Sequence, residues 1–125
     1  MLVRTLAIAA GGAAGAVLRF WMSSAVHRMV GAGFPYGTLV VNVVGSLLMG
    51  IGYALLVERM DVSAEIRAVL LVGVLGAFTT FSTFSIETLH LIEAGNALKA
   101  GLNVILSVCL CVGICWIGLL LGRQL

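Results

Sequence analysis

Five hydroxyl side chains lie within ten consecutive residues, 76–85, whose sequence is GAFTTFSTFS and which sit inside a long apolar segment. In a regular helix, at about 100° per residue, these hydroxyls would point to every side and leave no purely apolar face for lipid. Ser and Thr side chains also bond to nearby backbone carbonyls, and Gly76 removes side-chain packing, so a local break in the helix is expected. Carbonyl oxygens freed at membrane depth need protein, water or an ion as a partner. The run therefore predicts an ion-handling site.

Two other apolar segments each carry a stripe of polar or small polar residues at four-residue spacing, which places the members of a stripe on one helix face. The amide of Asn42 is costly in mid-membrane unless it is paired, so Asn42 either joins two helices or belongs to a polar path. The alignment of its stripe favours the path, and the second stripe is expected to face inward as well. The stripes are Thr38, Asn42 and Ser46, and Asn103, Ser107, Cys111 and Cys115.

The composition is that of an integral membrane protein. Of the 125 residues, 62% are hydrophobic and only 10% are charged, and the mean hydropathy is +1.20. At roughly 20 residues per crossing, the chain accommodates four helices with short loops and forms a single membrane domain over residues 1–125. The expected crossings run from about 3 to 26, from 36 to 57, from 64 to 93 with the break near its middle, and from 97 to 121.

The distribution of charges and cysteines argues against several classes of function. The basic residues form no cluster, so neither nucleic-acid binding nor a polybasic membrane-surface patch is indicated. Cys109, Cys111 and Cys115 have no His, Asp or Glu nearby in the sequence, which favours packing inside a helix over a disulfide or a metal site that needs a fourth ligand. The amino-terminal segment resembles a signal peptide, but its apolar character continues through Trp21, so we interpret it as a retained first helix.

Two charged positions border the apolar segments. Arg19 lies near one end of the first helix, where snorkelling to the interface and a functional role at a vestibule have equal weight. Glu87 and His90 are three residues apart, and we interpret them as a vestibular pair near the interface rather than a proton relay.

The basic residues are almost evenly divided between the two sides of the membrane. Both termini and the second connection share one side, and the other two connections share the opposite side. Such a balance allows insertion in both directions, and the two orientations could pair as an antiparallel dimer. The first side carries Arg4, Arg59, Arg67 and Arg123, and the second carries Arg28, Lys99 and, if it snorkels outward, Arg19.

The run GAFTTFSTFS at 76–85, preceded by GTLVVN at 37–42, resembles the Fluc (CrcB) fluoride channel family. The likeness covers nearly the whole chain. It implies an antiparallel dual-topology homodimer in the cell inner membrane, with two fluoride pores and a central structural sodium ion. In this chain the sodium ligands would be the backbone carbonyls of Gly76 and Thr79. Ala77 stands where family members often have a second glycine.

The resemblance also implies which residues contact fluoride. Phe81 and Phe84 would present their ring edges to the anion, and Asn42 would donate a hydrogen bond. The remaining positions of the implied path are Thr38, Ser82, Thr83 and Ser107. Arg19 and Glu87 are expected at the vestibule because they lie towards the ends of their helices. Cys111 and Cys115 occupy positions on the fourth helix where hydroxyls would be expected. Positive ring edges and neutral hydrogen-bond donors do suit a small anion that loses its water.

Other functions fit the sequence less well. A small proton-coupled multidrug exporter also has about four crossings, but it needs a membrane-embedded carboxylate, and Glu87 lies beyond the hydroxyl run towards the end of its helix. An assembly subunit without a transport role would leave the polar stripes unexplained. No nucleophile, base and orienting group occur together, so the sequence does not indicate an enzyme.

Overall fold

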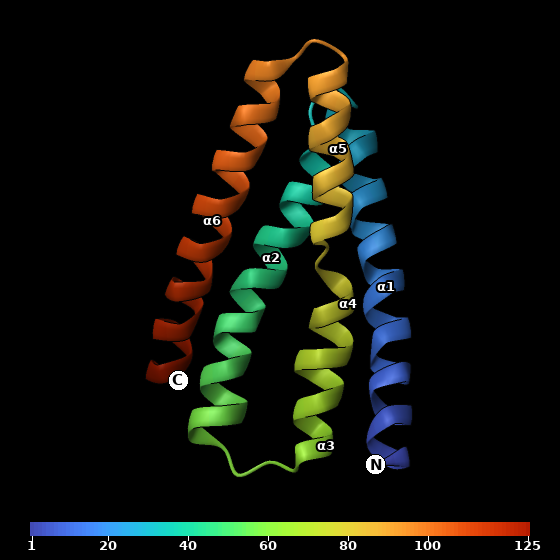
Figure 1. Cartoon of the computed structure of the whole chain (residues 1–125). Helices are drawn as coiled ribbons and strands as arrows, with labels where there is room; N and C mark the ends of the chain where they lie inside the picture. The colour runs from blue at the N-terminus through green and yellow to red at the C-terminus, as the bar shows by residue number, and fades with distance from the viewer.

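The computed structural model describes residues 1–125, and its regular structure is entirely helical. Four long helices cross the molecule in alternating directions (Figure 1), and each is long and apolar enough to span a membrane. The first crossing is α1 (Leu2–Val30), the second is α2 (Tyr36–Tyr53) continued by the π-helical η1 (Ala54–Arg59), and the fourth is α6 (Ala97–Gln124). The third consists of α3 (Ala64–Arg67), the π-helical η2 (Ala68–Leu75), α4 (Gly76–Phe78) and α5 (Phe81–Glu93).

Two of the expected helix ends are wrong by several residues. The first helix does not stop near residue 26 but continues through His27 to Val30, because no residue before Gly31 breaks it. Gly31 has a φ of 83° and its N–H donates to the carbonyl of His27, which ends the helix with a backbone angle that glycine adopts at no steric cost. The fourth helix likewise continues past residue 121 to Gln124.

The third crossing changes direction at Thr79 and Thr80. Both have extended backbone angles, with φ and ψ of −81° and 154° at Thr79 and −149° and 114° at Thr80. The Thr80 hydroxyl then accepts a hydrogen bond from the N–H of Thr83 and so caps α5. At the start of the same crossing, Ser63 caps α3 by accepting from the N–H of Ile66.

Glycines let the helices pack in two close pairs. Gly11 and Gly15 of α1 face η2 so closely that a Cβ on Gly11 would lie 2.6 Å from the carbonyl oxygen of Val69. Such small residues let two helix backbones approach closely. Gly50 of α2 and Gly118 of α6 form the second close approach, where a Cβ on Gly50 would lie 2.7 Å from the backbone nitrogen of Leu119.

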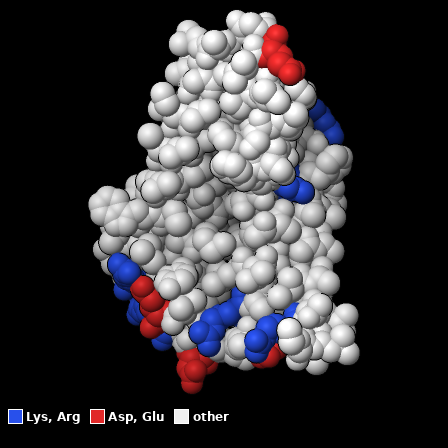
Figure 2. All heavy atoms as spheres, in the orientation of Figure 1, with Lys and Arg blue, Asp and Glu red and all other residues white.

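Most charged residues lie at one end of the bundle. On the face in Figure 2 they gather at the end that holds both termini and the α2–α3 connection, and the few others are scattered over the other half, one of them near mid-height. Arg123 forms two hydrogen bonds of 2.8 Å with the carboxylate of Glu58, and Arg59 donates to the carbonyl of Gly122. These contacts tie the end of the second crossing to the end of the fourth.

Candidate functional site

Asn42 of α2 holds the extended segment of the third crossing. Its Nδ2 donates to the carbonyl oxygen of Thr80 at 3.0 Å, and its Oδ1 accepts from the N–H of Thr80 at 2.7 Å. Thr80 is only 8% exposed, so these bonds satisfy backbone groups that water does not reach. The interhelical role considered for Asn42 is therefore present, and the second N–H of its amide stays available for another acceptor.

Two backbone N–H groups at the extended segment have partners other than those of a continuous helix. In a continuous helix the N–H of Thr80 would bond to the carbonyl of Gly76, and the N–H of Thr83 would bond to that of Thr79. Here the first donates to Asn42 and the second to the hydroxyl of Thr80. The carbonyls of Gly76 and Thr79 thus lose the donors that a helix would supply. The Thr79 hydroxyl itself turns back to the carbonyl of Leu75 at 3.0 Å.

A groove of about 370 Å³ opens beside this segment, between α2, α5 and α6. Phe81 and Phe84 both line it, with ring centroids 5.3 Å apart and ring planes tilted by 49°. Phe84 is buried, whereas Phe81 is 76% exposed. The other lining residues that bear on function are Asn42, Ser46, Met49, Thr79, Thr80, Ser107, Cys111 and Cys115. The groove therefore combines aromatic rings, amide and hydroxyl groups, and no carboxylate.

The polar stripe of α6 faces the interior, as expected. Asn103 is 2% exposed and its amide donates to the hydroxyl of Thr88 at 2.9 Å. Ser107, also buried, donates to Asn103 Oδ1 at 3.4 Å. This chain of hydrogen bonds leads along α6 to Ser107 at the groove.

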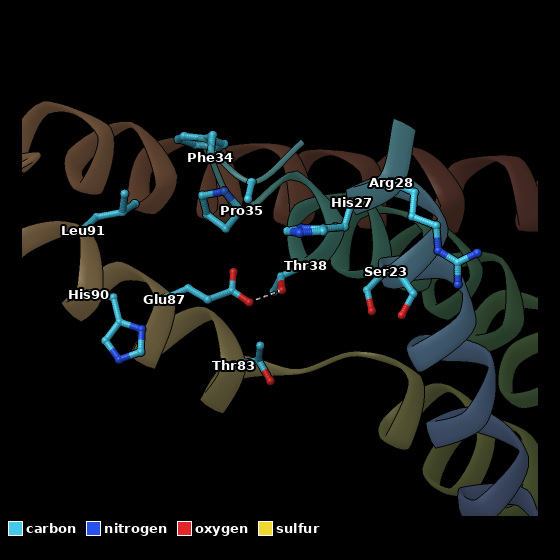
Figure 3. A pocket seen from close by; sticks show the side chains of 13 residues that line it. Ser23, His27, Arg28, Phe34, Pro35, Thr38, Thr83, Glu87, His90 and Leu91 are labelled. Carbon is cyan, nitrogen blue, oxygen red and sulfur yellow. Dashed lines mark hydrogen bonds between the residues drawn. The ribbon is translucent and has the colours of Figure 1, made fainter. Parts of the chain in front are cut away.

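A second cavity, of about 690 Å³, lies at the end of the molecule where α1 joins α2. In Figure 3, Glu87 of α5 points towards Thr38, whose hydroxyl donates to Glu87 Oε1 at 2.7 Å. Glu87 Oε2 is buried without a hydrogen-bond partner in the chain. His27 and His90 line the same cavity from α1 and α5. The cavity is therefore a polar vestibule with a single carboxylate.

The structure brings most of the predicted site residues into these two spaces. Asn42, Thr79, Phe81, Phe84 and Ser107 line the groove, and Thr38, Thr83 and Glu87 line the vestibule. Thr38 and Asn42 are one turn apart on α2, so the two spaces follow one face of that helix. Three predicted residues line neither space: Arg19, Gly76 and Ser82.

Four polar residues of α1 line the vestibule although the sequence did not indicate them. Ser23, Ser24, His27 and Arg28 line the cavity from the last turns of α1. Their four-residue spacing is a signal of one helix face. With the first helix expected to end near residue 26, His27 falls in a loop and the shared helix face is not recognised.

The sequence also matches a known family and several named proteins. The family model described as "CrcB-like protein, Camphor Resistance (CrcB)" matches residues 6–119. A protein of Methylococcus capsulatus named "Fluoride-specific ion channel FluC" is 56% identical over 119 residues, which are 95% of this chain and 52% of that relative. The chain thus spans about half the length of that relative.

Two further relatives with the same name are aligned over nearly their whole length. The protein of Coxiella burnetii (strain Dugway 5J108-111) is 49% identical over 124 residues, 98% of this chain and 100% of the relative. The protein of Pseudoalteromonas translucida is 50% identical over 117 residues, 94% of this chain and 98% of the relative.

Proposed function

Because this chain belongs to the CrcB family, we propose that it is a fluoride-selective channel, which exports fluoride passively across the cell membrane and lowers its toxicity in the cytoplasm. The observation that carries this function is the groove in which Asn42, Phe81 and Phe84 meet beside the extended segment. Its lining offers neutral hydrogen-bond donors and aromatic rings to an ion and holds no acidic side chain.

The lining suits a small anion that must shed part of its water. The edge of an aromatic ring is positive, so Phe81 and Phe84 can face fluoride with their ring hydrogens. The free N–H of Asn42 and the hydroxyl of Ser107 supply conventional donors. Donors spread along a path bind the ion loosely enough for release, since none of them carries a full positive charge.

The path runs from the vestibule to the groove. An anion enters through the vestibule beside Thr38 and Thr83, whose hydroxyls bond to Glu87 and to the hydroxyl of Thr80, respectively. It then passes Asn42 and reaches the phenylalanines and Ser107. Ser82 is exposed at the surface of the single chain and joins the path where a second copy covers it. Arg28, which lines the entrance, raises the local anion concentration there, and Arg19, farther along α1, adds to the positive potential.

A sodium ion at the extended segment fits the local backbone. The carbonyls of Gly76 and Thr79 lack the N–H donors that a continuous helix would give them, because Asn42 and the Thr80 hydroxyl accept those hydrogens. Carbonyl oxygens are the ligands that a hard cation prefers. A bound sodium ion would supply positive charge to these oxygens and so stabilise the interruption of the third crossing.

The functional unit is an antiparallel homodimer. Three features of the single chain support this assembly: Phe81 is 76% exposed, Gly76 and Ser82 are exposed within the same crossing, and the basic residues divide almost evenly between the two ends. A second copy would cover the first two features. The charge balance removes the usual bias towards one orientation. A reporter that is active on one side only, fused to the C-terminus, is expected to give signal from both sides, and signal from one side alone would exclude the antiparallel dimer.

A proton-coupled exporter is not favoured. The carboxylate of Glu87 lies in the vestibule with Thr38, and the groove beside the extended segment has no acidic residue.

Expression in a bacterial strain that lacks its own fluoride exporter tests the function. The chain is expected to restore growth in millimolar fluoride, whereas the Asn42→Asp variant, present in the membrane in equal amount, should not. Growth no better than that of cells with an empty vector, with folded protein in the membrane, would contradict the proposal.

A further inference from the structure

Sulfur atoms line the end of the groove that lies beyond Ser107. Cys111 and Cys115 face it from α6, and Met49 faces it from α2. Both cysteines are free thiols of intermediate exposure. The third cysteine, Cys109, is exposed and does not line the groove. It therefore serves as a control for the other two thiols.

The backbone holds the three sulfur-bearing residues close together. Cys111 and Cys115 are one turn apart on α6, which sets their Cβ atoms about 5–6 Å apart. Gly50 packs directly against the carbonyl of Cys115, at a close approach of α2 to α6. Met49, the residue next to Gly50, therefore lies across the groove from Cys115. The α2–α6 glycine contact thus brings together the backbones that carry these three residues.

Two thiols and a thioether form a ligand set for a soft metal ion. Thiolate and thioether sulfur bind Cu⁺ and similar ions, whereas Na⁺ and Mg²⁺ prefer oxygen. A tetrahedral zinc site needs four ligands, and nowhere in the chain do three His, Cys, Asp or Glu residues gather around a common point. Monovalent soft ions accept two or three sulfur ligands, which is what the groove offers.

We propose that Cys111 and Cys115, assisted by Met49, bind a soft monovalent metal ion such as Cu⁺ or Ag⁺ in the groove, and that the bound ion stops anion passage. On binding, both S–H bonds break, two S–metal bonds form, and two protons pass to water. Two thiolates and one monovalent cation carry a net charge of −1. The complex therefore repels an anion as well as filling the groove. The blocking step rests on the fluoride-channel function proposed above, whereas the binding step does not.

Silver is the probe for both steps, in buffers free of chloride, which would precipitate it. Calorimetric titration of the purified protein with Ag⁺ is expected to show tight binding accompanied by proton release. Cys109→Ser should bind as the unaltered protein does. Cys111→Ser and Cys115→Ser should each weaken binding by more than about tenfold, because the loss of even a residue that supports a ligand costs that much.

Fluoride efflux from liposomes measures the block, with each variant compared with its own flux without silver. Micromolar Ag⁺ should stop flux through the unaltered protein and through Cys109→Ser, and should leave flux through the Cys111→Ser, Cys115→Ser double variant. Binding that survives in a correctly folded double variant, or is lost in Cys109→Ser, would overturn the site. Binding without block would overturn the inhibitory role, and an absence of flux before silver is added would count against the channel function alone.

Discussion

Asn42 and Thr80 are joined by two hydrogen bonds across the contact between α2 and the third crossing, one of 3.0 Å to the carbonyl of Thr80 and one of 2.7 Å from its N–H. The Asn42 amide thereby supplies the hydrogen-bond partners that the extended backbone of Thr80 does not find within the helix. The same side chain also lines the groove. Asn42 therefore couples the shape of the third crossing to the lining of the anion path.

The Asn42→Asp variant tests this coupling. A carboxylate can still accept from the N–H of Thr80, but it leaves the Thr80 carbonyl without a donor and places negative charge in the anion path. We expect fluoride flux to fall at least about tenfold, and the free energy of unfolding to fall by about 1–3 kcal/mol. Normal flux through purified Asn42→Asp protein would remove Asn42 from the path.

Substitution of each of the two phenylalanines distinguishes a role in packing from a role in ion contact. Phe81→Ile and Phe84→Ile should both reduce fluoride flux, because isoleucine has no positive ring edge, while the dimer stays assembled in size-exclusion chromatography. Phe84 is buried within its own chain, whereas Phe81 is exposed there and would be covered only by the second copy, so Phe84→Ile should lower the melting temperature by loosening the packing inside the chain, and a change in Phe81→Ile would report on the dimer contact. Unaltered flux in both variants would exclude the rings from the mechanism.

Removal of sodium should lower the thermal stability of the folded protein. Long dialysis into N-methylglucamine is expected to lower the melting temperature, and added Na⁺ should restore it, since a ligand that binds only the folded state stabilises that state. N-methylglucamine is too large to replace a carbonyl-bound ion. A melting temperature independent of Na⁺ would contradict a sodium site formed by the carbonyls of Gly76 and Thr79.

Alanine substitutions of Gly15 and Gly12 form a matched pair that tests the contact between α1 and the third crossing. A Cβ on Gly15 would overlap the carbonyl of Val74, whereas a Cβ on Gly12 would make an ordinary contact of 4.0 Å with Ala77. Gly15→Ala should therefore lower the free energy of unfolding by about 1–3 kcal/mol. Gly12→Ala should be neutral or stabilising, because alanine favours the helix by about 1 kcal/mol. Thermal unfolding in detergent measures both, and equal effects would refute the close approach.

The sequence allowed the four crossings and the inward-facing polar stripe of α6 to be predicted, because hydropathy and four-residue spacing are local signals. The run 76–85 also contains the two residues with extended backbone. The pairing of Asn42 with Thr80 was beyond such reasoning, since residues 38 positions apart meet only through the packing of α2 on the third crossing. For the same reason the sequence did not distinguish the buried Phe84 from the exposed Phe81.

Fluoride efflux from liposomes is the most direct test of the channel function. Purified protein is reconstituted into vesicles loaded with fluoride or chloride, and efflux is followed with an ion-selective electrode after valinomycin sets the voltage. We expect rapid loss of fluoride with retention of chloride, and much slower loss of fluoride with Asn42→Asp. Retention of fluoride by vesicles that contain the folded protein, or equal loss of chloride, would contradict a fluoride-selective channel.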